Sequence, residues 1–126
     1  MIQFEQKVFY LETDTSSYWF CITDYGHLET IHYGKKLPKS DAEGVRVKRT
    51  AQVGSSVCYD EKDPLYVLDN IPLQWSGNGR GDYRYCPAEI RMPDGSFTHD
   101  FIYKNHRIEK GACGAESLPC ALDGKG

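Results

Sequence analysis

Short runs of aromatic and β-branched residues recur along the chain, and residues that favour turns separate them. No stretch sustains the 3.6-residue apolar period of an amphipathic helix. Short apolar runs between turn formers are typical of an all-β domain with many short strands. The sequence therefore predicts an all-β fold, with residues 1–126 forming a single domain or part of one.

Three strands can be placed in the first third of the chain. We expect them at 7–13, 17–23 and 27–33, with a polar turn at 13–17 and a second turn at Asp24-Tyr25-Gly26. The second strand is apolar enough to be covered on both faces, whereas the third alternates and is expected to be half-buried.

The chain becomes looser after residue 34. Valines alternate with basic residues over 45–50, which predicts an edge strand. Residues 51–65 predict a long exposed loop, and loops of this length are more often functional than idle. The remaining predicted strands are 66–71, 88–92 and 97–107, the last two joined by a turn at 93–96.

Charge and length exclude several classes of function. The chain has 15 Lys and Arg against 18 Asp and Glu, a net charge of -3, which argues against binding a nucleic-acid backbone. Its apolar runs are far shorter than the roughly 20 residues of a membrane span. At 126 residues it is also too short for a (β/α)₈ barrel, which needs about 200. We therefore expect no nucleic-acid partner and no membrane partner.

The cysteines indicate a reducing compartment. They are odd in number and scattered, without a C-x-x-C pair. We interpret them as reduced thiols of a cytoplasmic protein, because the N-terminus shows no secretory signal. Two disulfides and one spare thiol are the alternative. The five are Cys21, Cys58, Cys86, Cys113 and Cys120.

No metal site, cofactor site or catalytic constellation follows from residue spacing. The four histidines lie five and seven residues apart within each pair, which does not place two on one strand face. The carboxylate cluster at 60–63 is expected to be a solvated loop. The glycines at 77, 79 and 81 fit tight turns better than a phosphate loop. Trp75 precedes these glycines, where an aromatic ring commonly packs inward or stacks on a sugar, and both interpretations stay open.

A series of short motifs also runs through most of the chain in order. Its members are Tyr33-Gly34-Lys35, Leu68-Asp69, Gln74-Trp75, Gly79, Asp82-Tyr83-Arg84, Pro87-Ala88, Asp94-Gly95-Ser96, Asp100-Phe101-Ile102-Tyr103-Lys104-Asn105-His106-Arg107-Ile108, Lys110-Gly111 and Leu118-Pro119. In this order and spacing the series resembles the N-terminal region of the α-galactosidases of glycoside hydrolase family 36. Two departures are Trp75 in place of tyrosine and Ser76 in place of proline.

The resemblance implies an antiparallel β-sandwich, part of a larger super-sandwich that precedes a catalytic barrel. The parent enzyme would be a retaining α-galactosidase acting on melibiose, raffinose and related oligosaccharides. Both catalytic aspartates of such enzymes lie on the barrel, so this chain is expected to hold no catalytic residue and to be inactive alone. Its expected partners are the barrel, further copies of the protein and the α-galactoside substrate.

The resemblance also points to substrate-binding residues. Tetramers of the family pass an N-terminal loop to the neighbouring active site, where an aspartate and an arginine hold the sugar. Residues 45–66 match that loop. Arg49 retains the arginine and Asp60 is the candidate acid, which with Trp75 makes three predicted substrate-binding residues.

Two alternatives remain at this point. One is a stand-alone carbohydrate-binding or protein-interaction β-sandwich module, favoured by Trp75 and the glycine-rich turn. The other keeps the family and changes the sugar, as in α-N-acetylgalactosaminidases.

Overall fold

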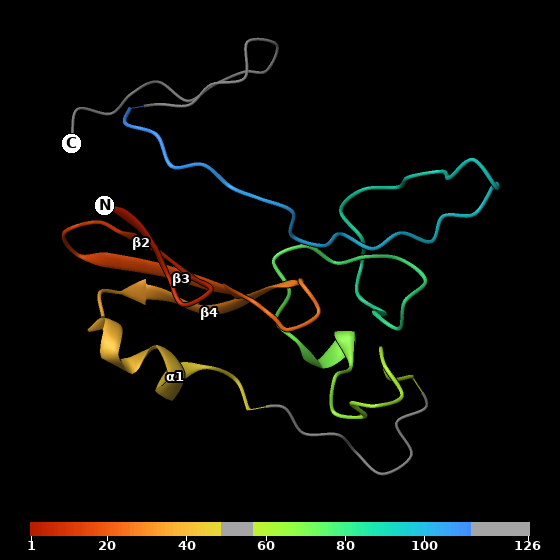
Figure 1. Cartoon of the computed structure of the whole chain (residues 1–126), viewed down its shortest axis with the longest axis horizontal. Helices are drawn as coiled ribbons and strands as arrows, with labels where there is room; N and C mark the ends of the chain where they lie inside the picture. Colours follow the sequence, from red (N-terminus) through yellow and green to blue (C-terminus); the bar gives the residue numbers. More distant parts are fainter. Residues whose placement is uncertain (49–56, 112–126) are drawn as a thin grey trace.

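The computed structural model describes residues 1–48 and 57–111, and its centre is one antiparallel sheet (Figure 1). The sheet has the order β1-β2-β3-β4, with β1 at Ile2–Glu5, β2 at Val8–Glu12, β3 at Ser16–Ile22 and β4 at Leu28–Lys35. The helical segments are short: η1 at Lys39–Asp41, α1 at Ala42–Val45 and η2 at Leu68–Asn70. The expected all-β, antiparallel fold class is confirmed.

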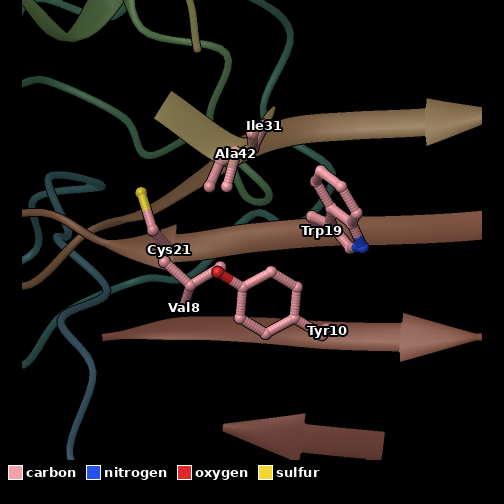
Figure 2. Close-up of a cluster of buried hydrophobic side chains, with 6 residues drawn as sticks. All are labelled: Val8, Tyr10, Trp19, Cys21, Ile31 and Ala42. Carbon is pink, nitrogen blue, oxygen red and sulfur yellow. The ribbon is translucent and has the colours of Figure 1, made fainter. Parts of the chain in front are cut away.

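Strands β2, β3 and β4 match the three predicted strands, and their alternation builds the main core. Val8 and Tyr10 on β2, Trp19 and Cys21 on β3 and Ile31 on β4 are all buried on one face. Figure 2 shows these side chains together with Ala42, which α1 supplies from above that face. Because successive strand residues point to opposite faces, the period of two turns these strand residues toward α1.

The opposite face of the sheet is also aromatic. Phe9 stacks on Phe20 with ring centres 4.7 Å apart and meets Phe4 at 4.5 Å. The segment that ends the described chain runs back over this face (Figure 1), and its His106 ring lies 4.8 Å from Phe9. The sheet is therefore covered by α1 on one side and by a strand-less segment on the other.

Strand β1 lies outside every predicted strand. It pairs with β2 through Glu5 and Val8, joined by a two-residue turn at Gln6 and Lys7. Both turn residues have positive φ, 49° and 67°, a conformation that glycine and asparagine adopt most readily. The two turn positions hold neither of the residues that would indicate a hairpin, so this strand was not predicted from the sequence.

The predicted edge strand over 45–50 is wrong where it is described. Val45 ends α1, and Arg46 to Lys48 follow without a strand. Arg46 turns inward to pair with the buried carboxylate of Glu29, while Val47 is exposed. The basic residue of this alternating pattern therefore points inward and the valine outward, because a buried negative charge attracts the basic residue. Residues 49–50 lie outside the described ranges.

The predicted strand at 66–71 is also wrong. Residues 68–70 form the 3-10 helix η2, and Tyr66, Val67, Leu68 and Ile71 are buried. Consecutive burial fits a segment wrapped into a core, not a strand with two faces. This second core contains Tyr66, Leu68 and Ile71, with Tyr25 and Tyr59 packed against it.

For the predicted hairpin at 88–107, the turn is confirmed and the two strands are wrong. The amide of Met92 donates to the carbonyl of Ser96 at 2.8 Å across the turn at 93–95. Neither arm forms a strand, because the two arms separate and His99 instead donates its amide to Asn78 at 3.1 Å. The return arm thus becomes a connection that crosses the molecule.

The outer edge of β4 is partly covered. The segment 72–74 runs antiparallel to it, with the amide of Thr30 donating to Pro72 at 2.7 Å and that of Gln74 donating to Leu28 at 2.8 Å. This pairing brings Trp75 to the end of the sheet. The described part of the predicted loop, 57–65, is closed by a hydrogen bond from the Tyr59 amide to the Tyr66 carbonyl at 2.9 Å.

Candidate functional site

The structure places two of the three predicted substrate-binding residues. Arg49 lies outside the described ranges. Asp60 and Trp75 lie on different segments, and no direct contact joins them. Each therefore has to be described by its own surroundings.

Asp60 sits in the turn that opens the segment 57–66. Its Oδ1 accepts the amide of Lys62 at 2.9 Å, and its Oδ2 accepts the Tyr25 hydroxyl at 3.0 Å. Burial raises the pKa of Tyr25, and the hydrogen bond to Asp60 adds to the effect. Both carboxylate oxygens thus already have donors, so Asp60 shapes this turn while remaining partly open to solvent.

Trp75 is 46% exposed and packs edge-on against Phe101, also 46% exposed, with ring centres 5.7 Å apart. The preceding residue fixes its position. Gln74 accepts a hydrogen bond from the Tyr18 hydroxyl and donates one to the hydroxyl of Thr30. The ring is therefore held by β3 and β4 and presented as one half of an exposed aromatic pair.

The densest polar arrangement surrounds a residue that spacing alone did not single out, Asp100. The Asp100 cluster consists of Asp100, His27, Tyr59, Tyr66 and Arg80. Asp100 Oδ1 lies 2.8 Å from His27 Nε2, and Oδ2 accepts the Tyr59 hydroxyl at 2.6 Å. Arg80 approaches the same Oδ2 at 3.7 Å.

A directed chain of hydrogen bonds continues inward from His27. A carboxylate only accepts, so the Nε2 proton of a neutral His27 points to Asp100 and Nδ1 accepts the Tyr66 hydroxyl at 2.8 Å. Tyr66 in turn lies 2.6 Å from the hydroxyl of Thr23, which also accepts the His27 amide at 3.0 Å. His27 and Tyr66 are buried, so the chain is shielded from water.

The electrostatics of the Asp100 cluster favour a fixed scaffold. Burial raises the pKa of Tyr59, and its hydrogen bond to Asp100 acts in the same direction. Arg80 lies over the Tyr59 ring at 5.1 Å, and its hydrogen bond to Tyr59 raises its pKa. Each oxygen of Asp100 accepts from at least one partner, so Asp100 anchors three segments of chain.

A second anchor uses the motif residues Asp82 and Arg84. Arg84 holds the Asp82 carboxylate with Nε at 2.8 Å and Nη2 at 3.1 Å. It also donates to the carbonyls of Ile71 and Leu68, each at 2.7 Å. These carbonyls close η2, so one guanidinium ties the glycine-rich segment to the second core.

The described residues hold no group of three or more His, Cys, Asp or Glu side chains placed to bind a metal ion. Nor is any described helix long and apolar enough to cross a membrane.

The sequence also matches a family model, the glycosyl hydrolase family 36 N-terminal domain, over residues 26–124. The chain belongs to this family.

Relatives of this family 36 N-terminal domain are much longer proteins. This chain is 29% identical over 116 residues to alpha-galactosidase 1 of Pediococcus pentosaceus, and the match covers 92% of this chain and 16% of that protein. It is 26% identical over 114 residues to the bifunctional alpha-galactosidase/sucrose kinase AgaSK of Mediterraneibacter gnavus, covering 90% of this chain and 12% of the relative.

Solved structures agree with this assignment. The galactosidase domain of AgaSK superimposes with a TM-score of 0.84 at 27% identity, over 95% of this chain and 17% of that one. The GH36 alpha-galactosidase AgaB from Geobacillus stearothermophilus gives 0.82 at 28% identity, over 95% and 16%. The family 36 N-terminal domain therefore spans between 12% and 17% of the proteins it resembles.

Proposed function

We propose that this chain is the non-catalytic N-terminal β-sandwich portion of an α-galactosidase. The parent enzyme hydrolyses terminal α-galactosides of the melibiose and raffinose type with retention of configuration. The observation that carries the proposal is the alignment of over nine-tenths of the chain with a small N-terminal fraction of a named α-galactosidase, 92% against 16%.

The chain contributes structure to that enzyme and is inactive alone. The carboxylates of its two polar anchors, Asp100 and Asp82, accept hydrogen bonds from side chains of the chain itself. A glycosidase instead needs two carboxyl groups facing each other across an open cleft. The catalytic barrel is therefore the partner that supplies the chemistry.

The segment 45–66 is the part that reaches toward substrate. Its described ends are both fixed to the domain. Arg46 Nη2 lies 2.8 Å from the buried Glu29, and Tyr59 donates to Asp100 at 2.6 Å. Partly buried polar contacts anchor the chain on both sides of Arg49, and Asp60 directly follows the second contact, which suits the segment to present Arg49 and Asp60 to the active site of a neighbouring subunit.

The same proposal includes a homo-oligomer in the cytoplasm. A loop that completes a neighbouring active site requires more than one copy of the protein. The thiols of Cys58 and Cys86, neither in a disulfide, suit a reducing compartment.

An activity assay tests the proposal directly. The full-length protein is expected to hydrolyse an aryl α-galactoside, and the isolated chain is expected to be inactive. Arg49→Ala should raise KM in the full-length enzyme, whereas Lys48→Ala, its neighbour of like charge, should leave KM unchanged. No α-galactosidase activity in the full-length protein would refute the assignment.

The exposed pair of Trp75 and Phe101 favours a second candidate, a carbohydrate-binding module. Edge-on aromatic pairs at a surface offer a face on which a sugar ring stacks. Titrating galactose or raffinose into the chain while following tryptophan fluorescence separates the two. A saturable change that Trp75→Phe abolishes supports sugar binding, because the other tryptophan, Trp19, is buried. If fluorescence shows no saturable change, the carbohydrate-binding candidate is refuted and the first proposal remains.

A further inference from the structure

A thiol and an imidazole face each other at a site that the proposed function does not use. Cys86 Sγ lies 3.3 Å from His99 Nε2. Cys86 also lines a cavity of about 330 Å³, together with Asn78, Arg84, Tyr85, Pro87, Ala88 and Glu89. Cys86 is only partly buried, and the cavity that it lines is the route by which we expect a small molecule to approach it.

The His99 ring is fixed in the orientation that makes Nε2 an acceptor. Its Nδ1 lies 3.1 Å from the carbonyl of Phe97, which only accepts, so Nδ1 carries the ring proton. The ring is buried, and it packs against Phe101 with ring centres 5.1 Å apart. The lone pair of Nε2 is thereby directed at the thiol of Cys86.

The other neighbours of the sulfur make it depend on His99. Two carbonyl oxygens approach Sγ, that of Ala88 at 2.9 Å and that of Ser76 at 3.2 Å. They accept from a thiol but repel a thiolate. Transfer of the thiol proton to His99 Nε2 places an imidazolium beside the sulfur, and this is the charge that offsets the repulsion.

We propose that Cys86 is a modification site, a thiol that peroxides oxidise to sulfenic acid with His99 as its base. His99 takes the thiol proton, and the sulfur attacks one oxygen of hydrogen peroxide. The S–O bond forms as the O–O bond breaks, so the sulfur loses two electrons and the peroxide gains them. The leaving hydroxide takes a proton from His99 and departs as water, which leaves Cys86 as S–OH.

The test measures sulfenic acid formation cysteine by cysteine in the full-length protein. The protein is treated with hydrogen peroxide in the presence of dimedone, and labelled peptides are quantified by mass spectrometry. Cys58 is the internal comparator, because it is also partly buried. We expect Cys86 to be labelled about tenfold faster than Cys58 near pH 7, because His99 Nε2 is placed to take the Cys86 proton.

Two variants separate the base from the packing. His99→Asn keeps a side-chain donor near the Phe97 carbonyl and removes the base, and His99→Gln places an amide near Nε2 that accepts but does not take a proton. Both should lower the Cys86 rate toward that of Cys58. The buried Cys21 reports unfolding, because its labelling rises only if the core opens.

Two outcomes of these labelling-rate measurements would contradict the proposal. A wild-type Cys86 rate equal to or below that of Cys58 overturns it, and this comparison needs no variant. An unchanged Cys86 rate in both His99 variants overturns the role of the base.

Discussion

Arg84 shows how the contacts of one side chain account for a family-like motif in physical terms. Its planar guanidinium has five N–H donors in a fixed geometry. Four of its hydrogen bonds reach Asp82, Ile71 and Leu68. A lysine has the same charge but cannot match this fork, so the site requires arginine specifically.

Arg84→Lys should therefore destabilise the protein. We expect a loss of about 2 kcal/mol in the free energy of unfolding, since a charged carboxylate and two carbonyls lose their donors. Chemical denaturation measures it. Arg107→Lys is the control, because the Arg107 side chain is 84% exposed, and an equal loss there would contradict this role for Arg84.

The carboxyl of Asp82 should make stability fall in acid. Burial alone would raise its pKa, but the hydrogen bonds from the Arg84 side chain and amide hold that pKa below the usual value. A lowered folded-state pKa contributes stability above the unfolded value of about 4, and this contribution is lost as the pH falls through the folded value. Unfolding measured from pH 7 to pH 2 should show the decline.

Asp82→Asn is the matched variant for that pH series. It keeps the shape of the side chain and has no titrating carboxyl. Its stability should be lower than wild type at pH 7, and the difference should narrow below pH 4. A gap that stays constant across the series would show that Asp82 does not contribute to acid sensitivity.

At the scale of the elements, the β1–β2 hairpin carries a local cost. Gln6 and Lys7 both adopt positive φ without being glycine or asparagine. The hairpin forms because β1 adds to a sheet whose other strands already pack on two sides. Local turn preference is overridden there by the cross-strand contact of Phe4 with Phe9 and by the tertiary contact of Phe4 with His106.

Replacing Gln6-Lys7 with Asn-Gly should stabilise the hairpin by about 1 kcal/mol, because this pair adopts positive φ readily. The change removes the contact of Lys7 with Asp24, which is exposed and contributes little. Thermal unfolding measures the gain. Lys7→Ala alone isolates the lost ion pair, and no gain over that variant would contradict a strained turn.

Gly26 lies in the turn between β3 and β4, and its carbonyl accepts the amide of Tyr103 at 2.8 Å. It has φ +88°, and a Cβ there would lie 2.4 Å from Ile102 Cγ2. Gly95 has φ +83° with open space around it. Gly95→Ala should cost about 1 kcal/mol from backbone strain alone, and Gly26→Ala should cost more because of the clash.

Chemical denaturation of the two glycine variants gives the difference. Equal losses would show that Ile102 yields to the added methyl group and that close approach does not constrain Gly26.

The sequence predicted those strands that are short apolar runs between turn formers. Strands β3 and β4 alternate in burial with a period of two, β2 is buried at three successive residues, and the turn after β3 ends in glycine. The failures have one physical cause: a contact distant in sequence reverses the local signal. Glu29 draws Arg46 inward, and the carbonyls of η2 are held by Arg84, so neither the described part of the first segment, 45–48, nor the segment at 66–71 forms the strand its composition favours.

The candidate site was predictable only in part for the same reason. Trp75 was singled out by its place before a glycine-rich turn, and it is half-exposed as a recognition residue would be. The Asp100 cluster joins residues that no local spacing relates. The one sequence feature that pointed to this cluster was the position of Asp100 at the start of the longest family-like motif. That motif identifies the residue but not the residues that it contacts.

At the scale of the whole molecule, the sheet is not sealed. Within the described ranges β1 pairs with β2 on one side only. A cavity of about 380 Å³ lies over the aromatic face, lined by Ile2, Phe9, Leu11, Phe20 and residues of the segment 106–111. Open strand edges and apolar surface are sites at which sheets add further chains.

The isolated chain should therefore associate with itself or be marginally stable. Sedimentation at several concentrations measures association, and thermal unfolding measures stability. Ile2→Lys, which places a charge beside both the open edge and the apolar cavity, should reduce any association. A monodisperse isolated chain with a high melting temperature would argue against exposed edges.

The contact between His27 and Asp100 spans 73 positions of the chain. During synthesis the β1 to β4 meander needs only neighbouring segments and is able to pair early, because its contacts are local. The buried imidazole of His27 cannot pair with Asp100, and Tyr59 cannot donate to it, until residue 100 has left the ribosome. The sheet is therefore able to form before these loop contacts do. A pause in synthesis before residue 100 would leave a folded sheet whose loops lack their contacts with Asp100.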